Sequence, residues 1–190
     1  IWGGQPETDP DQPNTLPMPL GDGGIYHPVR GWRPIPPSPN APARAFHTAA
    51  WTGDTGNPTT ANKMLVWGGC ERELADTCAG MRNDTLLFYP QSGWTVLHGR
   101  GPVPSPRHNA SVLYVKDQAK LYIFGGINSR GQVLADGFVL DLRSARWTPL
   151  PLQTRARFKH RAVWAGDRMM VFGGKTYNTA TRRYELADEV

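Results

Sequence analysis

A short apolar run that ends in two glycines is repeated along this chain of 190 residues. Three complete copies, Lys63–Gly69, Lys120–Gly126 and Arg168–Gly174, each consist of a basic residue, four apolar or aromatic residues and Gly-Gly. Residues Ile1–Gly4 match the end of a fourth copy. One such run predicts a buried strand followed by a turn, but four of them predict a repeat protein. The repeated glycines are Gly3, Gly4, Gly68, Gly69, Gly125, Gly126, Gly173 and Gly174.

Aligning the glycine pairs reveals three more strands in each unit. The segment before each complete run begins with arginine and has an aromatic residue at its eighth place, at 44–51, 107–114 and 157–164. After each run, a segment of variable length leads to an aspartate that precedes a third strand. A fourth strand begins with tryptophan, and a connector rich in proline, which cannot donate to a sheet ladder, leads onward. The aspartates are Asp22, Asp84, Asp136 and Asp188, and the tryptophans are Trp32, Trp94 and Trp147.

Four short antiparallel strands in a unit of about 50 residues, marked by Gly-Gly and Trp, resemble the kelch repeat, in particular its bacterial-style form. The motifs Val66–Gly69, Ile123–Gly126 and Val171–Gly174 carry this resemblance, which covers nearly the whole chain. It implies an all-β fold, a kelch-type β-propeller with four-stranded blades. We expect 1–190 to be part of one propeller domain, with blades at 1–35, 44–98, 107–150 and 157–190.

The ring is expected to be incomplete, with about three to four blades present. The first blade lacks its first strand, and the last blade stops where its third strand begins. These absent parts do not complement one another, and the resemblance implies a propeller with more blades. We therefore expect further blades to come from additional sequence or from another chain.

The repeated residues have a structural and a functional interpretation. The glycines let the chain leave the second strand through backbone angles closed to other residues, whereas a phosphate-binding loop would need a Gly-x-x-x-x-Gly-Lys motif that does not follow. The tryptophans, with Tyr26 and Tyr89, are expected to pack between neighbouring blades rather than to form a carbohydrate platform. The aspartates recur one blade apart at strand entries, which favours a turn or hydrogen-bonding role over a metal site. Without a cluster of Cys, His and carboxylate ligands, we expect neither a metal nor another cofactor.

Arg44, Arg107 and Arg157 are the candidate binding residues. The start of a first strand and the end of the second strand lie at the same edge of an antiparallel pair, so these arginines should share a rim with the loops after each Gly-Gly. Those loops vary in length on a constant scaffold, as is typical of binding surfaces. The kelch resemblance implies that an arginine at this place can pair with acidic groups of a partner peptide. The alternative is an arginine that only ties blade to blade.

Cys70 and Cys78 are the only cysteines, and both lie in the segment after the Gly68–Gly69 pair. Two cysteines do not make a metal site, because the other two ligands are missing. A disulfide that closes the loop is the preferred interpretation, and two reduced thiols are the alternative. A disulfide predicts an extracytoplasmic protein, either periplasmic or secreted.

Composition and motifs favour a binding module over an enzyme. The net charge of +5 comes mostly from scattered arginines, with one cluster at 155–161, so we expect no nucleic-acid partner. No apolar window is long enough to span a membrane. The favoured function is a non-catalytic binding or scaffold module for a protein or peptide partner, because no catalytic constellation stands apart from the repeat. The alternative is a fragment of a kelch-propeller enzyme that acts on sugars, of the oxidase or epimerase type.

Overall fold

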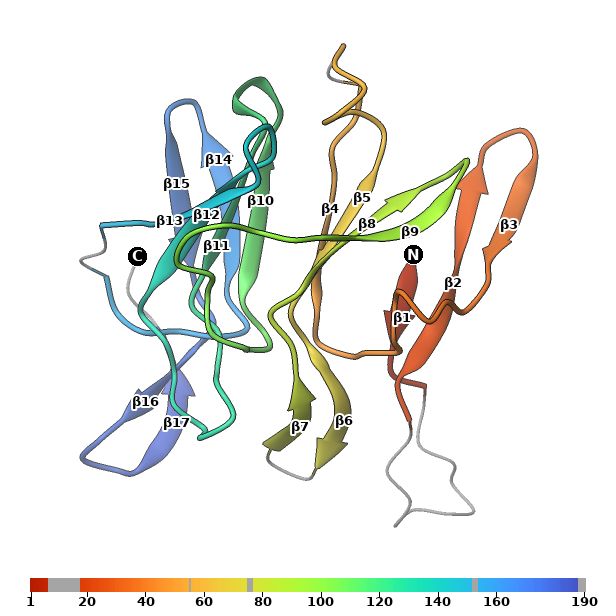
Figure 1. The fold of residues 1–190 in the computed structure, drawn as a ribbon. Helices are drawn as coiled ribbons and strands as arrows, with labels where there is room; N and C mark the ends of the chain where they lie inside the picture. Colours follow the sequence, from red (N-terminus) through yellow and green to blue (C-terminus); the bar gives the residue numbers. More distant parts are fainter. Residues whose placement is uncertain (7–17, 55, 75–76, 152–153, 188–190) are drawn as a thin grey trace.

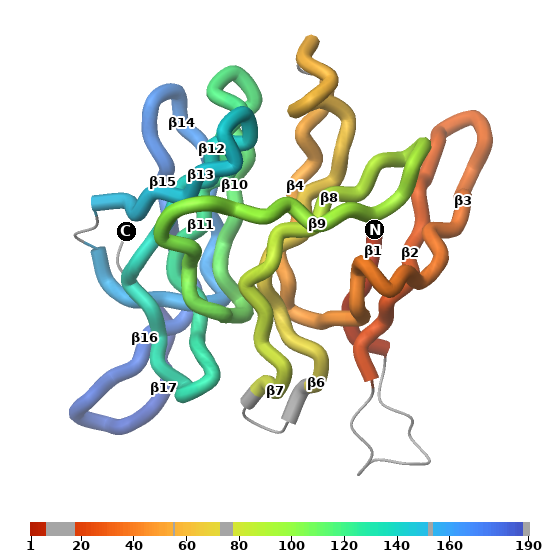
Figure 2. Tube along the Cα trace, in the orientation of Figure 1, coloured from red at the N-terminus to blue at the C-terminus, as the bar shows by residue number. Residues whose placement is uncertain are grey.

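The computed structural model describes residues 1–6, 18–54, 56–74, 77–151 and 154–187. These residues form β-strands and one 3-10 turn, η1 (Lys116–Gln118), with no α-helix among them. Four antiparallel sheets stand side by side in chain order and do not close into a ring (Figures 1 and 2). This arrangement confirms the predicted all-β fold, and we call the four sheets blades 1 to 4.

Blades 2 and 3 have four strands, and the described parts of blades 1 and 4 have three and two. Blade 1 comprises β1 (Trp2–Gly4), β2 (Leu20–His27) and β3 (Gly31–Ile35). Blade 2 comprises β4 (Thr48–Trp51), β5 (Met64–Trp67), β8 (Thr85–Tyr89) and β9 (Gly93–Leu97). Blade 3 comprises β10 (Ser111–Val115), β11 (Lys120–Phe124), β12 (Gly137–Asp141) and β13 (Arg146–Pro149). Blade 4 comprises β14 (Arg161–Ala165) and β15 (Arg168–Phe172). The strands β4, β10 and β14 neighbour one another across the blade boundaries and are therefore the inner strands.

The inner strands begin later than the sequence predicts. They start at Thr48, Ser111 and Arg161 rather than at the arginines four places earlier. The cause is a left-handed residue in each lead-in segment, since Phe46, Asn109 and Lys159 have φ of 55°, 54° and 55°. A left-handed residue interrupts an extended strand, and the backbone there bonds across the blade boundary instead. The amide of Asn109 donates to the carbonyl of Phe46 at 3.2 Å, and that of Lys159 donates to Asn109 at 3.0 Å.

Two hairpins project from the same end of the sheets, where the sequence predicted loops (Figure 1). One pairs β6 (Cys70–Leu74) with β7 (Thr77–Met81), and the other pairs β16 (Lys175–Asn178) with β17 (Arg183–Leu186). Cross-strand contacts hold the second hairpin, because the rings of Tyr177 and Tyr184 lie 5.6 Å apart and Asn178 donates to Glu185 at 2.7 Å. In blade 3 the corresponding segment is a short turn at 127–133. We call the two hairpins and this turn the rim loops.

The Gly-Gly pairs are required by the approach of the next blade. In blades 1, 2 and 3 the second glycine of the pair donates its amide to the carbonyl of the arginine that leads the following blade: Gly4 to Arg44 at 3.0 Å, Gly69 to Arg107 at 3.0 Å and Gly126 to Arg157 at 2.9 Å. The first glycine lies against the same carbonyl. A Cβ on Gly125 would stand 2.4 Å from the carbonyl oxygen of Arg157. Both glycines of this pair also have positive φ, +64° and +99°, so no other residue fits without strain.

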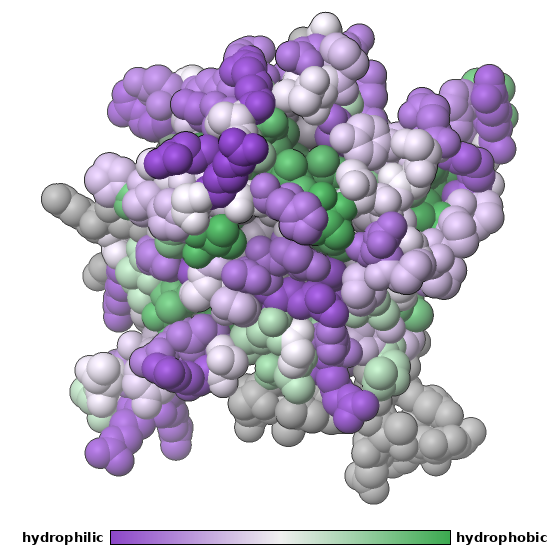
Figure 3. Space-filling view, in the orientation of Figure 1, coloured by the Kyte–Doolittle hydropathy of each residue, from purple (hydrophilic) through white to green (hydrophobic). Residues whose placement is uncertain are grey.

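Apolar side chains form two core clusters at the boundaries between blades. Trp147 is 1% exposed and lies 6.1 Å from Trp67 of the preceding blade. Trp94 lies 4.7 Å from Trp2 in the same way. Trp32, which we expected to pack similarly, is exposed because no described strand covers its side of blade 1. On the side of the molecule drawn in Figure 3, the surface is mostly hydrophilic, and hydrophobic residues show in patches among the polar ones.

We expect Gly125→Ala to destabilise the fold more than Gly93→Ala. Both glycines have positive φ, so each substitution costs about 1–2 kcal/mol of backbone strain. A Cβ at Gly93 meets nothing within 4 Å, whereas one at Gly125 collides with the backbone of blade 4. Urea denaturation of the two variants should therefore give a free energy of unfolding that is lower for Gly125→Ala. Equal losses would contradict the role assigned to the Gly-Gly pair.

Candidate binding rim

The arginines that lead blades 2 and 3 are buried beneath the rim loops. Arg44 and Arg107 are both 0% exposed. Each guanidinium makes a forked pair with one aspartate of its own blade: Arg44 with Asp84 at 2.6 and 2.9 Å, and Arg107 with Asp136, where the second contact is 2.9 Å. Each also donates to the carbonyl of the first glycine of its blade, at 3.2 Å to Gly68 in blade 2. A bidentate arginine–carboxylate pair fixes orientation as well as charge, so these contacts hold the three strand ends together.

The third arginine follows the same pattern as far as it is described. Arg157 is 3% exposed and donates to the carbonyl of Gly173 at 3.2 Å. Asp188, at the place of Asp84 and Asp136, lies outside the described residues. Asp22 lies within β2 and is exposed. Of the two roles considered for the arginines, this geometry supports the one that ties the structure together, and direct contact with a partner stays a prediction.

The pairing between the arginines and the aspartates was not foreseen from the sequence. The aspartates were expected to have a turn or hydrogen-bonding role, with no partner named, and Asp84 and Asp136 are the charge partners of buried arginines. The order of residues in the repeat was nevertheless enough to predict this pairing. Arginine leads the first strand and aspartate precedes the third, and both strands flank the second strand of the same sheet. Their adjacent ends must therefore meet at one edge.

A pocket of about 510 Å³ opens at the rim end of the three inner strands. Four consecutive residues from each of blades 2, 3 and 4 line it: 46–49, 109–112 and 159–162. The strand ends fix its position, because the first residue of β10, Ser111, pairs with the last residue of β11, Phe124, just before the rim turn. Lys159 and Arg161 are exposed on its lining, and none of the described residues that line it is acidic. The pocket is therefore positively charged.

Three histidines near this pocket are held neutral. Burial, together with a neighbouring cation, lowers the pKa of His47, His108 and His160 from 6.5 to about 4. The rings have packing roles that explain their place. His47 meets the ring of Trp2 edge-on at 5.4 Å, and His160 meets Phe124 at 5.2 Å, so each covers an aromatic residue of the preceding blade. His160 Nε2 also lies 2.7 Å from the hydroxyl of Ser111.

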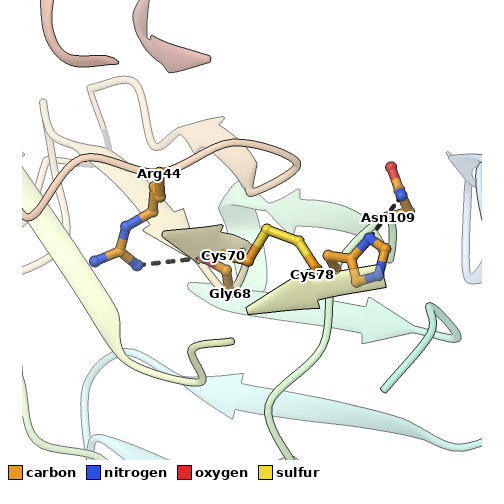
Figure 4. The surroundings of a disulfide bond; sticks show 6 residues. Arg44, Gly68, Cys70, Cys78 and Asn109 are labelled. Atoms are coloured by element: carbon orange, nitrogen blue, oxygen red, sulfur yellow. Dashed lines mark hydrogen bonds between the residues drawn. A yellow bond between two sulfur atoms is a disulfide. The ribbon is translucent and has the colours of Figure 1, made fainter. Parts of the chain in front are cut away.

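Cys70 and Cys78 are joined in a disulfide within the β6–β7 hairpin, between the first residue of β6 and the second residue of β7. Figure 4 shows Arg44 and Gly68 on one side of this bond and Asn109 on the other. Both cysteines are buried, and the backbone of Cys70 exchanges two hydrogen bonds of 3.0 Å with Ala45. The hairpin is thus attached to the lead-in segment of its own blade through Cys70 and Ala45. The disulfide in addition joins β6 to β7.

The described residues contain no group of three or more Cys, His, Asp or Glu side chains arranged to hold a metal ion. Among them, no helix has the length and apolar character needed to cross a lipid bilayer.

We expect the protein to lose stability as the pH falls from 7 to 5. Because the folded state keeps His47, His108 and His160 neutral at pH values where the unfolded chain protonates them near 6.5, acid favours unfolding, by up to about 1.4 kcal/mol per pH unit for each histidine. Urea denaturation at pH 7, 6 and 5 measures this slope. His160→Gln should flatten it, and His27→Gln, at an exposed position, should leave it unchanged. A slope that is the same in all three proteins would contradict the assignment.

Comparison with known proteins identifies relatives of several kinds. The chain is 29% identical over 153 residues to Adagio-like protein 3 of Oryza sativa subsp. japonica, and the alignment covers 75% of this chain and 22% of that protein. It is 30% identical over 130 residues to host cell factor homolog hcf-1 of Caenorhabditis elegans, and the alignment covers 60% of this chain and 16% of that protein. It is 29% identical over 147 residues to Kelch domain-containing protein 1 of Mus musculus, and the alignment covers 76% of this chain and 32% of that protein. The chain thus spans less than a third of each of these relatives.

These relatives correct the predicted location. The cysteine pair led us to expect a periplasmic or secreted protein, but the relatives are intracellular kelch proteins, so that prediction is wrong. The physical reason is that a disulfide within one hairpin shows that two cysteines are within bonding reach. It does not identify the compartment in which they are found.

The family model described as "KLHDC2/KLHL20/DRC7 Kelch-repeats domain" matches residues 46–188. This match covers well over half of the chain. It includes the strands and the Gly-Gly pairs of blades 2, 3 and 4. The chain therefore belongs to the kelch-repeat family.

Proposed function

We propose that this chain is a non-catalytic binding module that presents its rim loops and the pocket between its inner strands to a protein or peptide. Kelch domains generally bind proteins, which supports the general class. The observation that carries the proposal is the positively charged pocket at the rim end of blades 2, 3 and 4, lined by backbone segments whose course is fixed by Phe46, Asn109 and Lys159. A rigid, preformed concave site loses little conformational entropy when a partner binds.

The partner in this proposal is an acidic protein segment. Lys159 and Arg161 are exposed at the pocket, and the part of its lining that the structure describes offers no acidic side chain to compensate their charge. Carboxylates are the complementary groups, and electrostatic attraction favours their approach. The rim loops differ in sequence and length from blade to blade, so they provide the contacts that select one partner over another.

The buried arginines support this surface in the proposal. Arg44, Arg107 and Arg157 have little or no exposed area, so we assign contact with the partner to exposed residues. The arginines keep the strand ends and rim loops in place. Loss of one of them would weaken binding only through loss of the folded rim.

We expect Lys159→Glu and Arg161→Glu each to weaken binding of acidic peptides by at least about tenfold, since each variant replaces attraction by repulsion. The probes are peptides enriched by display selection against the whole chain, and fluorescence anisotropy measures their Kd. Lys116→Glu is the matched control, because Lys116 is an exposed lysine in η1, outside the pocket.

The salt dependence gives a second readout of the same proposal. Affinity for the wild-type chain should fall as salt rises, and this dependence should be smaller in the two pocket variants. Selection of peptides without acidic residues, or equal losses in the pocket variants and in Lys116→Glu, would overturn the proposed site.

A further inference from the structure

A second groove lies among the rim loops, apart from the positively charged pocket. It has a volume of about 610 Å³ and lies between the rim turn 127–133 of blade 3 and the β16–β17 hairpin of blade 4 (Figures 1 and 2). We call it the tyrosine groove. It shares no described lining residue with the pocket, and its own lining consists of 130–133, Ala156, Thr176, Tyr177 and Tyr184. Its walls come from consecutive blades, so the groove is an internal feature of the rim.

Two tyrosines form the hairpin wall of the tyrosine groove. Tyr177 and Tyr184 stand opposite each other in β16–β17, so both side chains project from the same face of the hairpin. Their ring planes are inclined at 68°, and the side chains are 44% and 42% exposed. The hydroxyl of Tyr184 donates to the carbonyl of Gly131 at 2.9 Å, and its ring meets Phe158 edge-on at 5.2 Å. These two contacts hold the wall in place, so the groove is preformed.

The opposite wall uses its hydrogen-bond acceptors within the rim turn. The side-chain oxygen of Asn128 accepts from the amides of Arg130 and Gln132 at 3.0 and 3.1 Å. The carbonyl of Asn128 accepts from the amide of Gly131 at 3.0 Å. The carbonyl of Gln132 accepts from the amide of Asn128 at 3.1 Å, and its side-chain oxygen accepts from the Asn128 side chain at 3.0 Å. Since Tyr184 occupies the carbonyl of Gly131, the acceptors of this wall are already engaged.

Hydrogen-bond donors, in contrast, remain free at the groove. No described residue pairs with the guanidinium of Arg130 or bonds to the hydroxyl of Tyr177, and both residues are exposed. A complementary ligand therefore offers acceptors, few donors and flat apolar surfaces. The negative faces of the tyrosine rings disfavour an anion and favour a neutral ligand. Consecutive prolines have this character, because each proline has a carbonyl but no N–H, and the polyproline II helix makes no internal hydrogen bonds.

We propose that the tyrosine groove binds a proline-rich segment of a protein partner in the polyproline II conformation. Proline rings pack on Tyr177 and Tyr184, while Arg130 and the hydroxyl of Tyr177 donate to the carbonyls of the segment. An aromatic-lined groove with donors at its edge is the arrangement that such segments require. The proposal goes beyond the acidic ligand of the charged pocket, since the site, the ligand and the main attraction all differ.

Fluorescence anisotropy with a labelled decaproline peptide and the whole chain tests the proposal. Binding should be saturable, and Tyr177→Ala should weaken it by at least about tenfold through loss of a ring contact. Arg130→Leu should weaken it as well, whereas Arg130→Gln, which keeps two donors without the charge, should retain most of the affinity. Tyr26→Ala and Arg30→Leu are the matched controls, because both residues are exposed and lie outside the groove, and they should bind like the wild type.

Three further measurements separate this site from the charged pocket and from misfolding. Circular dichroism checks the fold of each variant. Lys159→Glu should leave the Kd for decaproline unchanged, so a failure of the pocket proposal and a failure of this one are distinguishable. Salt should have little effect on the Kd, since the ligand is neutral. Absence of decaproline binding, equal binding of a glycine–serine decamer, or equal losses in Tyr177→Ala and Tyr26→Ala would overturn the proposal. Salt-sensitive binding that Arg130→Gln abolishes would also overturn it, because it would identify an anion site.

Discussion

One arginine, four residues before each inner strand, joins a blade to itself and to the blade before it. The backbone amide of Arg107 donates to the carbonyl of Arg82 at 3.3 Å, and its carbonyl accepts from Gly69 at 3.0 Å, both in blade 2. Its guanidinium then binds Asp136 and the carbonyl of Gly125 in blade 3. The main chain of this residue therefore contacts one blade and its side chain another. Arg44 repeats the arrangement between blades 1 and 2.

Other features of the repeat follow from this connection. Glycine is needed in the preceding blade because the arginine carbonyl approaches too closely for a Cβ. The lead-in segment turns through a left-handed residue, so the inner strand begins only after that turn. The inner strands of neighbouring blades then converge around the positively charged pocket. The rim loops leave from this fixed region, and they can vary without disturbing it, as expected where a rigid scaffold carries a binding surface.

The sequence was sufficient to predict the fold but only part of the rim. Periodic Gly-Gly and tryptophan markers predicted antiparallel blades, because the same local pattern recurs wherever the same packing is needed. The β6–β7 and β16–β17 hairpins escaped prediction because each occurs once, with its own sequence, and repetition gives no help there. The exposure of Trp32 could not be read from the sequence either, since its position in the repeat is the same as that of buried Trp147. Burial depends on the neighbouring blade, and no residue within the blade encodes it.

The arginines have a structural role that the sequence did not reveal. An arginine at a rim is a natural candidate for binding an acidic partner, and that role stays a prediction, while the buried side chains of Arg44 and Arg107 pair with partly exposed carboxylates of their own blades. The exposed cations at the pocket, Lys159 and Arg161, hold places that differ between blades and carried no repeat signal. Features shared by all blades describe the scaffold, and features particular to one blade are better guides to function.

The contribution of the buried arginine to stability is the most direct test of this scheme. Urea denaturation should give a free energy of unfolding that is lower by about 2 kcal/mol or more for Arg107→Ala, because the substitution removes the buried guanidinium that donates to both Asp136 and the carbonyl of Gly125. Arg168→Ala removes an exposed arginine that pairs with exposed Asp167, and it should lower the free energy of unfolding by much less, because solvent screens this pair. A loss for Arg107→Ala no greater than that for Arg168→Ala would contradict the central place given to the arginine.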